Sequence, residues 1–244
     1  MGGVQYSVGV RLPKLVAQIH LHFKSKSPSY ARLINPYYGL NNLDESISRY
    51  IGIEKGIYVE IGGNDGISQS NTKYFEQQHG WAGILIEADP KLFKKMKRNR
   101  SSNNYFANFA CVSAEFKGRL IPLIRGNLMS SVLDSSNHIE DPSAHAAAGN
   151  RKAQTENNKV DVPVSTLTNI LRQSKVSAPI KFLSLDVEGY ELEVLKGLDF
   201  REYTVQWICL EIRKFDLIND FLTGEGFELV AKLSFHDYLY RRSD

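Results

Sequence analysis

One stretch constrains the fold of this chain more than any other, the segment Tyr58-Val-Glu-Ile-Gly-Gly-Asn-Asp-Gly66. An apolar run from Ile57 to Ile61 ends there in a tight glycine turn, and polar residues and a helical pattern follow. This order predicts a strand, a glycine loop and a helix. Gly62 and Gly66 let a ligand approach the backbone without meeting a Cβ, and the start of the helix offers unpaired N–H groups. We therefore expect a ligand-binding crevice at the carboxyl end of this strand.

Two carboxylates suggest which ligand the crevice takes. Glu60 ends the first strand, and Glu87 ends the next apolar run, about 20 residues beyond the glycine turn, where a ribose diol is bound in nucleotide-binding folds. The spacing Glu-x-Gly-x-x-x-Gly is looser than the dinucleotide fingerprint, and a plain strand–turn–helix without a ligand is the alternative. Asn64 stands where a dinucleotide site has its second glycine. A side chain there suits a nucleoside without phosphates, such as S-adenosylmethionine.

Several motifs together resemble those of the FkbM family of methyltransferases. They are Val59-Glu-Ile-Gly-Gly-Asn-Asp-Gly66, Ser70-Asn-Thr72, Gly80-Trp81, Gly83-Ile-Leu-Ile-Glu87 and Ser184-Leu-Asp-Val-Glu-Gly-Tyr-Glu191. The resemblance extends from about Asn42 to Phe235, with Glu60 in place of the commoner Asp and Gly63 in place of Ala. It implies a class I methyltransferase fold, S-adenosylmethionine as methyl donor, and a hydroxyl acceptor on a sugar or sugar-decorated metabolite.

The expected fold is α/β, Rossmann-like, with an open, mostly parallel seven-stranded sheet, helices on both faces and a C-terminal antiparallel hairpin. Apolar runs predict parallel strands at 57–61, 83–87, 105–108, 180–185 and 205–210, and a closing hairpin at 227–232 and 234–240. We expect a helical extension over residues 1–41 and the methyltransferase domain over 42–244. Residues 119–124 and Val112 suggest an extra hairpin, and the polar segment 125–159 is expected to be a loop that folds over the crevice as a lid.

The predicted cofactor-binding residues come from the carboxyl ends of the strands and from the loops that follow them. In the fold that the resemblance implies, the residues just beyond the third strand lie near the adenine. The full set is Glu60, Gly62, Asn64, Asp65, Gly66, Ser70, Asn71, Thr72, Glu87, Ala88, Asn108, Ala110, Cys111 and Asp186.

Acidic residues at the ends of the fourth and fifth strands are the catalytic candidates. A sugar hydroxyl is a poor nucleophile at neutral pH, so a base or a metal must assist it. Asp186 and Glu188 are the first choices as base or acceptor-binding carboxylates, Glu211 is the next, and His236 is a further candidate. The predicted substrate-binding residues are Ser130, Ser131, Glu188 and Arg213. His138 and His145 are interpreted as solvated loop histidines.

Composition and charge limit the cofactors and partners that we expect for this chain. Asp186, Glu188 and Glu211 could offer oxygen ligands to Mg²⁺, but catalysis without a metal is the preferred prediction, and no metal ligand is assigned. A net charge of +3 does not call for nucleic acid as a partner, and no apolar stretch is long enough to span a membrane. Two cysteines within apolar runs form no disulfide pattern, so the cytoplasm is the expected location. Residues 1–40 could join this domain to a larger polypeptide or to a second copy in a homodimer.

Two other functions remain open from the sequence. The donor could serve an RNA or protein acceptor, although the near-neutral charge and the lack of an Asn-Pro-Pro-Tyr motif argue against RNA. Alternatively, the glycine loop could hold NAD in a sugar-modifying Rossmann enzyme. A comparison of S-adenosylhomocysteine and NAD as stabilising ligands separates these possibilities.

Overall fold

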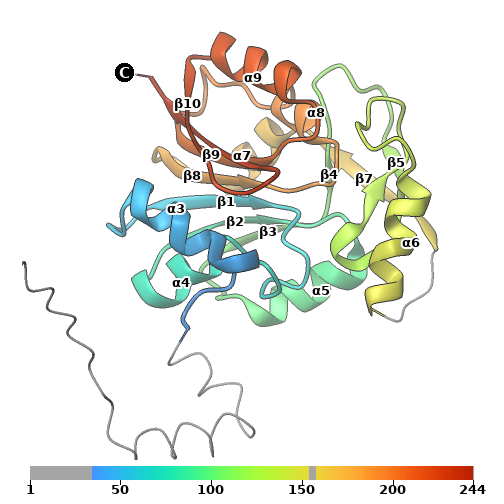
Figure 1. The fold of residues 1–244 in the computed structure, drawn as a ribbon, viewed down its shortest axis with the longest axis horizontal. Coiled ribbons are helices and arrows are strands. Elements are labelled where there is room, and N and C mark those ends of the chain that lie inside the picture. Colours follow the sequence, from blue (N-terminus) through green and yellow to red (C-terminus); the bar gives the residue numbers. More distant parts are fainter. Residues whose placement is uncertain (1–34, 154–157, 244) are drawn as a thin grey trace, which may run out of the picture. The chain divides into compact units, whose positions relative to one another are not determined.

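The computed structural model describes residues 35–153 and 158–243, and its centre is a seven-stranded sheet (Figure 1). The strands lie in the order β10-β11-β9-β8-β1-β2-β3, and β11 runs antiparallel to both of its neighbours. Their bounds are β1 Ile57–Ile61, β2 Ala82–Ile86, β3 Tyr105–Ala107, β8 Ile180–Leu185, β9 Val205–Glu211, β10 Phe227–Lys232 and β11 Asp237–Arg242. This confirms the class I methyltransferase fold, with its parallel strands and its closing hairpin.

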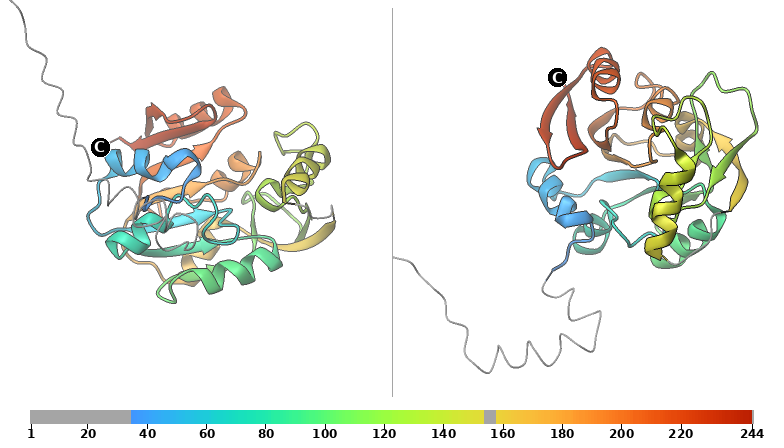
Figure 2. Two further views of the ribbon diagram at one scale, coloured as in Figure 1. Left: turned by 60° about the horizontal axis from the view of Figure 1, so that its bottom comes forward. Right: turned by 45° about the vertical axis from the view of Figure 1, so that its right-hand side comes forward.

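Helices cover both faces of this sheet, which explains why its parallel strands are apolar on both sides. The side chains of α3, α4 and α5 form one core with Tyr58, Leu85 and Phe182, and those of α7, α8 and α9 form the other core with alternate strand residues. The helices are α3 Leu43–Ile51, α4 Lys73–His79, α5 Pro90–Asn99, α7 Leu167–Ser174, α8 Glu191–Leu195 and α9 Phe215–Gly224, with a 3-10 turn, η1, at Leu40–Asn42. Figure 2 shows the two helical layers from other sides.

The strand register brings the functional ends together. Ile61 pairs with both Ile86 and Leu185, and Leu185 pairs with Leu210. The residues that follow these four positions therefore emerge at one edge of the sheet. That edge is where ligands of open α/β sheets bind.

A second, four-stranded sheet lies beside this edge and was not expected from the sequence (Figure 1). Its order is β4-β7-β5-β6, with β4 Ala110–Cys111, β5 Leu120–Ile124, β6 Ser131–Val132 and β7 Lys159–Ser165. The hairpin expected between Val112 and residues 119–124 is wrong, because β5 pairs with β6 and β7 instead.

The segment expected to be a polar loop is largely folded. It contains the 3-10 turn η2 at Asn127–Met129, strand β6 and helix α6 at Pro142–Ala153. Asp141 begins α6 by accepting a hydrogen bond from Ala144 N at 2.9 Å, and the alanines that follow are strong helix formers. Below, "the insertion" means residues 125–153.

The compact unit that contains both sheets begins at Tyr37. The helix predicted near the N-terminus lies outside the described residues. Within residues 35–153 and 158–243, none of the helices is both long and apolar enough to cross a membrane.

Candidate active site

A hollow lies where β1, β2 and β8 end, between the large sheet and the insertion. Its empty volume is about 580 Å³, including the part open to solvent. The predicted residues that line it are Gly62, Asn64, Glu87, Ala88, Ala110, Cys111, Ser130, Asp186 and Glu188. The ends of the first, second and fourth parallel strands therefore share one pocket.

Gly62 makes this junction possible. Its φ is +82°, and a Cβ at this position would lie 1.8 Å from the carbonyl oxygen of Asp186. Its N–H donates to the carbonyl of Ile86 at 3.0 Å. One residue thus touches the ends of both neighbouring strands, and only glycine fits there.

Glu87 forms the polar end of the hollow. Its carboxylate accepts hydrogen bonds from Asn64 N at 2.8 Å and from Asp89 N at 2.7 Å. Burial raises the pKa of Glu87 to about 7, although these backbone hydrogen bonds act in the opposite direction. Asn108 does not line the hollow, but its amide donates to the carbonyls of Glu87 and Ala88 and fixes the chain there. Each carboxylate oxygen keeps a lone pair that a ribose hydroxyl can use.

Apolar side chains form the wall beside Glu87. Ile86 and Phe109 come from the large sheet and its loop, and Leu123, Leu128 and Val132 come from the second sheet and the insertion. Cys111 is buried in the same region, and desolvation raises the pKa of its thiol to about 12. The thiol therefore stays protonated and serves as part of an apolar surface that suits a flat heterocycle.

Glu60 does not line the hollow. Its carboxylate accepts hydrogen bonds from Ser70 Oγ at 2.9 Å and Asn71 N at 3.0 Å, and from Thr72 Oγ1 at 2.8 Å. Arg100, whose side chain is fully buried, forms an ion pair with it at 2.9 Å. Strand alternation explains this placement, because Glu60 shares its face with Tyr58 and not with Ile61. The Glu60 carboxylate therefore stabilises the chain that follows the glycine loop.

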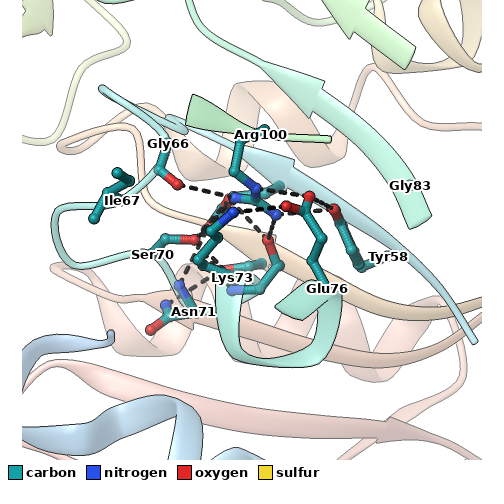
Figure 3. A network of polar contacts seen from close by, with 12 residues as sticks. Tyr58, Gly66, Ile67, Ser70, Asn71, Lys73, Glu76, Gly83 and Arg100 are labelled. Carbon is teal, nitrogen blue, oxygen red and sulfur yellow. Dashed lines mark hydrogen bonds and ion pairs between the residues drawn. The ribbon is translucent and has the colours of Figure 1, made fainter. Parts of the chain in front are cut away.

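The same network extends to α4. Arg100 Nε lies 2.9 Å from Glu76 Oε2, and Tyr58 Oη donates to the same oxygen at 2.8 Å (Figure 3). Burial alone would raise the pKa of Glu76, but the charge of Arg100 and the hydrogen bonds from Lys73 and Arg100 lower it to about 2. Glu76 is therefore ionised at neutral pH.

The remaining predicted loop residues also support the loop and do not line the hollow. Asp65 Oδ1 accepts hydrogen bonds from Ile67 N and Ser68 N, and the carbonyl of Gly66 accepts one from Arg100 at 3.4 Å. Ser70, Asn71 and Thr72 are buried against Glu60. Their predicted contact with a cofactor stays a prediction.

Two of the catalytic candidates, Asp186 and Glu188, line the hollow, and the third, Glu211, lies close to them. One oxygen of each lies within 4.8 Å of the others. The Asp186 side chain is open to the hollow and has no hydrogen-bond or ion-pair partner among the described residues. Desolvation by the surrounding protein, followed by the negative charges of Glu188 and Glu211, raises its pKa.

Arg213 and His145 both contact this cluster. Arg213 lies 2.9 Å from Glu188 Oε2 and 2.9 Å from Glu211 Oε1. Desolvation, together with the charge of Glu188, raises the pKa of Glu211 to about 7 even though Arg213 acts against it. The interpretation of His145 as a solvated loop histidine is wrong, since its Nε2 lies 2.7 Å from Glu188 Oε2. This contact could not be predicted from the sequence because His145 belongs to helix α6, which was not expected.

Of the other predicted residues, Ser130 lines the hollow, whereas Ser131 and His236 do not. Ser131 Oγ donates to the carbonyl of Glu188 at 3.0 Å, so its role is to hold the β8–α8 turn. Ser130 lines the hollow, and its hydroxyl donates to the carbonyl of Asn127 at 2.8 Å. The His236 ring packs edge-on against Phe235 with centroids 4.6 Å apart, while its carbonyl accepts a hydrogen bond from Ile212 N. His138 donates its backbone N–H to the carbonyl of Gly189.

The three acids form a candidate oxygen site for a divalent cation. Two of them, however, already form ion pairs with Arg213, and one of these two also pairs with His145. A cation there would have to compete with a guanidinium for the same oxygens. This donor set fits a metal poorly.

The chain is similar to known methyltransferases. A family model described as the methyltransferase FkbM domain matches residues 60–240. A protein named Methyltransferase 1 from Beauveria bassiana (strain ARSEF 2860) is 24% identical over 186 residues, which cover 71% of this chain and 73% of that protein.

Solved structures with a similar fold include a METTL16 MTase domain, with a TM-score of 0.47 and 12% identity. The match covers 82% of this chain and 65% of that one, slightly less than two thirds of its length. Another is methyltransferase FkbM from Methylobacillus flagellatus KT, with a TM-score of 0.44, 14% identity, and coverage of 77% of this chain and 43% of that chain.

Proposed function

Because the chain belongs to the FkbM methyltransferase family, we propose that it transfers a methyl group from S-adenosylmethionine to a hydroxyl of a sugar or glycan. The observation that supports this most is that Gly62, Glu87 and the unpaired carboxylate of Asp186 line one hollow. In this proposal, a nucleoside-binding end and a proton-accepting end share a single pocket.

The residues of the hollow fit the cofactor. Glu87 would accept the ribose hydroxyls, and the wall of Ile86, Phe109 and Leu123 would cover the adenine. The cofactor supplies a methyl group that its sulfonium already activates. The protein's main task is therefore alignment, which can lower such a barrier by about 7–11 kcal/mol.

Asp186 is proposed as the general base. It accepts the proton of the acceptor hydroxyl while that oxygen forms its bond to the methyl carbon and the carbon–sulfur bond breaks. Its raised pKa brings it closer to neutrality than an ordinary aspartate, which favours proton transfer at physiological pH. Assistance of this kind contributes about 10²–10⁴-fold to the rate.

The first experiment identifies the cofactor. S-adenosylhomocysteine and NAD are each titrated against the protein, and the melting temperature is recorded. We expect stabilisation by S-adenosylhomocysteine alone. A rise with NAD instead would indicate the sugar-modifying Rossmann enzyme that the sequence left open.

The second experiment tests the reaction. Labelled S-adenosylmethionine is incubated with nucleotide sugars, methyl glycosides and short glycans, and separately with RNA and protein acceptors, with and without EDTA. We expect transfer to a carbohydrate hydroxyl that EDTA does not suppress, because Arg213 already binds two of the three acids. Transfer only to RNA or protein would contradict the proposed acceptor.

Asp186→Asn tests the base. The amide keeps the shape of the carboxylate but cannot accept the proton, so turnover should fall by about 10²–10⁴-fold. Binding of S-adenosylhomocysteine, measured by calorimetry, should stay close to that of the wild type. Unchanged turnover would exclude Asp186 as the base.

A further inference from the structure

The turn between β8 and α8 holds Glu188 in an unfavourable backbone conformation. Its φ is +55°, in the left-handed region that residues with a Cβ rarely adopt. The carbonyl of Glu188 accepts hydrogen bonds from Ser131 Oγ at 3.0 Å and from Asn137 Nδ2 at 3.4 Å. Both donors belong to the insertion. The insertion therefore stabilises the turn that carries this carboxylate.

The insertion also contacts the Glu188 side chain through α6. His145, with 14% of its side chain exposed, lies with Nε2 at 2.7 Å from Glu188 Oε2. Arg213 donates to the same oxygen at 2.9 Å. An oxygen that accepts from a guanidinium is an acceptor toward the imidazole as well, so the proton of a neutral His145 resides on Nε2.

These contacts leave two acceptor groups without partners among the described residues. One is Glu188 Oε1, and the other is the carboxylate of Asp186. Both residues line the hollow, and one oxygen of the Asp186 carboxylate lies within 4.8 Å of one oxygen of the Glu188 carboxylate. Two carboxylates at this separation can receive two hydroxyl groups on adjacent carbon atoms.

We infer that His145 is a positioning residue, which fixes Glu188 so that Asp186 and Glu188 bind the two hydroxyls of a vicinal diol. This inference rests on the proposed O-methyl transfer. Asp186 takes the proton of the hydroxyl that is methylated, and Glu188 Oε1 accepts a hydrogen bond from its neighbour. The acceptor class is therefore a polyol in which the methylated oxygen has an adjacent hydroxyl.

The imidazole itself gives a test that needs no acceptor. Nitrogen-15 spectra of the histidine rings, with His145 assigned by its loss in His145→Gln, report which ring nitrogen carries the proton. In the wild type we expect the Nε2–H form, and in Glu188→Gln we expect its signals to shift. An Nδ1–H form, or signals that do not shift in Glu188→Gln, would overturn the inference that His145 positions Glu188.

Kinetics with the most active glycoside or nucleotide sugar then test the role in transfer. In His145→Ala, kcat/KM for the acceptor should fall by about 10²-fold, because small misplacements of an orienting group cost that much. His145→Gln, whose amide nitrogen can replace Nε2, should recover much of the loss. His145→Asn, whose amide can replace only Nδ1, should not. His79→Gln, on the distant helix α4, is the control with unchanged activity, and S-adenosylhomocysteine binding should be unaffected in every variant.

Two thermodynamic cycles distinguish a positioning role of His145 from a merely structural one. The first combines two mutations, and the second combines a mutation with a change of acceptor. In a Glu188→Gln background, His145→Ala should cause little further loss. With an acceptor analogue that lacks the neighbouring hydroxyl, the wild type should fall toward the His145→Ala value, and the two defects should not add. Additive losses in either cycle, or equal rates with the diol and its deoxy analogue, would overturn the inference. If the wild type methylates no carbohydrate, both the proposed function and the inferred diol acceptor are wrong. The ring spectra still test whether His145 positions Glu188.

Discussion

The Glu87 carboxylate is buried at the end of β2 and accepts two backbone hydrogen bonds. Burial nevertheless raises its pKa to about 7, so near neutral pH the carboxyl group is partly protonated in the protein without ligand. A protonated carboxyl loses an acceptor for the ribose hydroxyls. Ligand binding at this residue should therefore depend on pH in a range where most carboxylates are fully ionised.

We predict that the affinity for S-adenosylhomocysteine weakens as the pH falls from 8 to 6, because the ionised form of Glu87 is the better acceptor of two hydroxyls. Isothermal calorimetry across this range measures the effect. In Glu87→Gln the affinity should be lower and nearly independent of pH. A wild-type affinity that rises on acidification would contradict the assigned role.

Single residues also show what the sequence could reveal about the site. Glu87 and Asp186 each follow an apolar run that ends at the same edge of the sheet. The pattern of apolar strands was therefore enough to predict that both line one pocket. The buried ion-pair partner of Glu60 is Arg100, which lies 40 residues away along the chain. His145 and Glu188 are 43 residues apart. No local pattern carries information on such distant partners.

At the scale of elements, the turn after β1 joins the ends of three strands. Gly62 and Gly226 both have φ of +82°, but only Gly62 has a neighbour where a Cβ would be placed. The two glycines thus separate the cost of a left-handed backbone from the cost of steric overlap.

Gly226→Ala should lower the free energy of unfolding by about 1–2 kcal/mol, the cost of a left-handed conformation with a Cβ. Gly62→Ala should cost distinctly more, since its Cβ would lie 1.8 Å from the carbonyl oxygen of Asp186. It should also abolish binding of S-adenosylhomocysteine. Urea unfolding measures the first effect and calorimetry the second, and equal losses in the two variants would refute the argument.

The elements differ in how far the sequence predicts them. Strand β8 occupies the range predicted from its apolar run, and α9 ends at the glycine expected to stop it. Helix α6 was missed because glycine, serine and asparagine surround its alanines, although Asp141-Pro142 is a recognisable helix start. The second sheet was missed because β4 and β6 have two residues each. Strands so short have no periodicity to detect.

Across the whole molecule, several buried carboxyl groups favour the protonated state. Desolvation raises the pKa of Glu87, Glu191 and Glu211 from 4.5 to about 7. Such groups bind protons more tightly in the folded state than in the unfolded state. Their contribution to stability is fully present below pH 4.5 and is lost as the pH rises through 7. His138, whose pKa burial lowers, acts in the opposite direction.

We predict that the melting temperature of the ligand-free protein decreases between pH 5 and pH 8. Glu191→Gln should reduce this dependence, because Glu191 is buried and does not line the hollow. The exposed Glu228→Gln serves as the matched control and should leave it unchanged. Thermal melts in buffers of equal ionic strength measure the slope, and a melting temperature that rises over this range would contradict the prediction.

The insertion touches both halves of the hollow within a short stretch of chain. Leu128 and Val132 belong to the wall proposed for the adenine, while Ser131 and His145 hold Glu188. Binding of either substrate should therefore increase the affinity of the site for the other. Thermodynamic linkage makes this coupling reciprocal, so each substrate should raise the affinity for the other by the same factor.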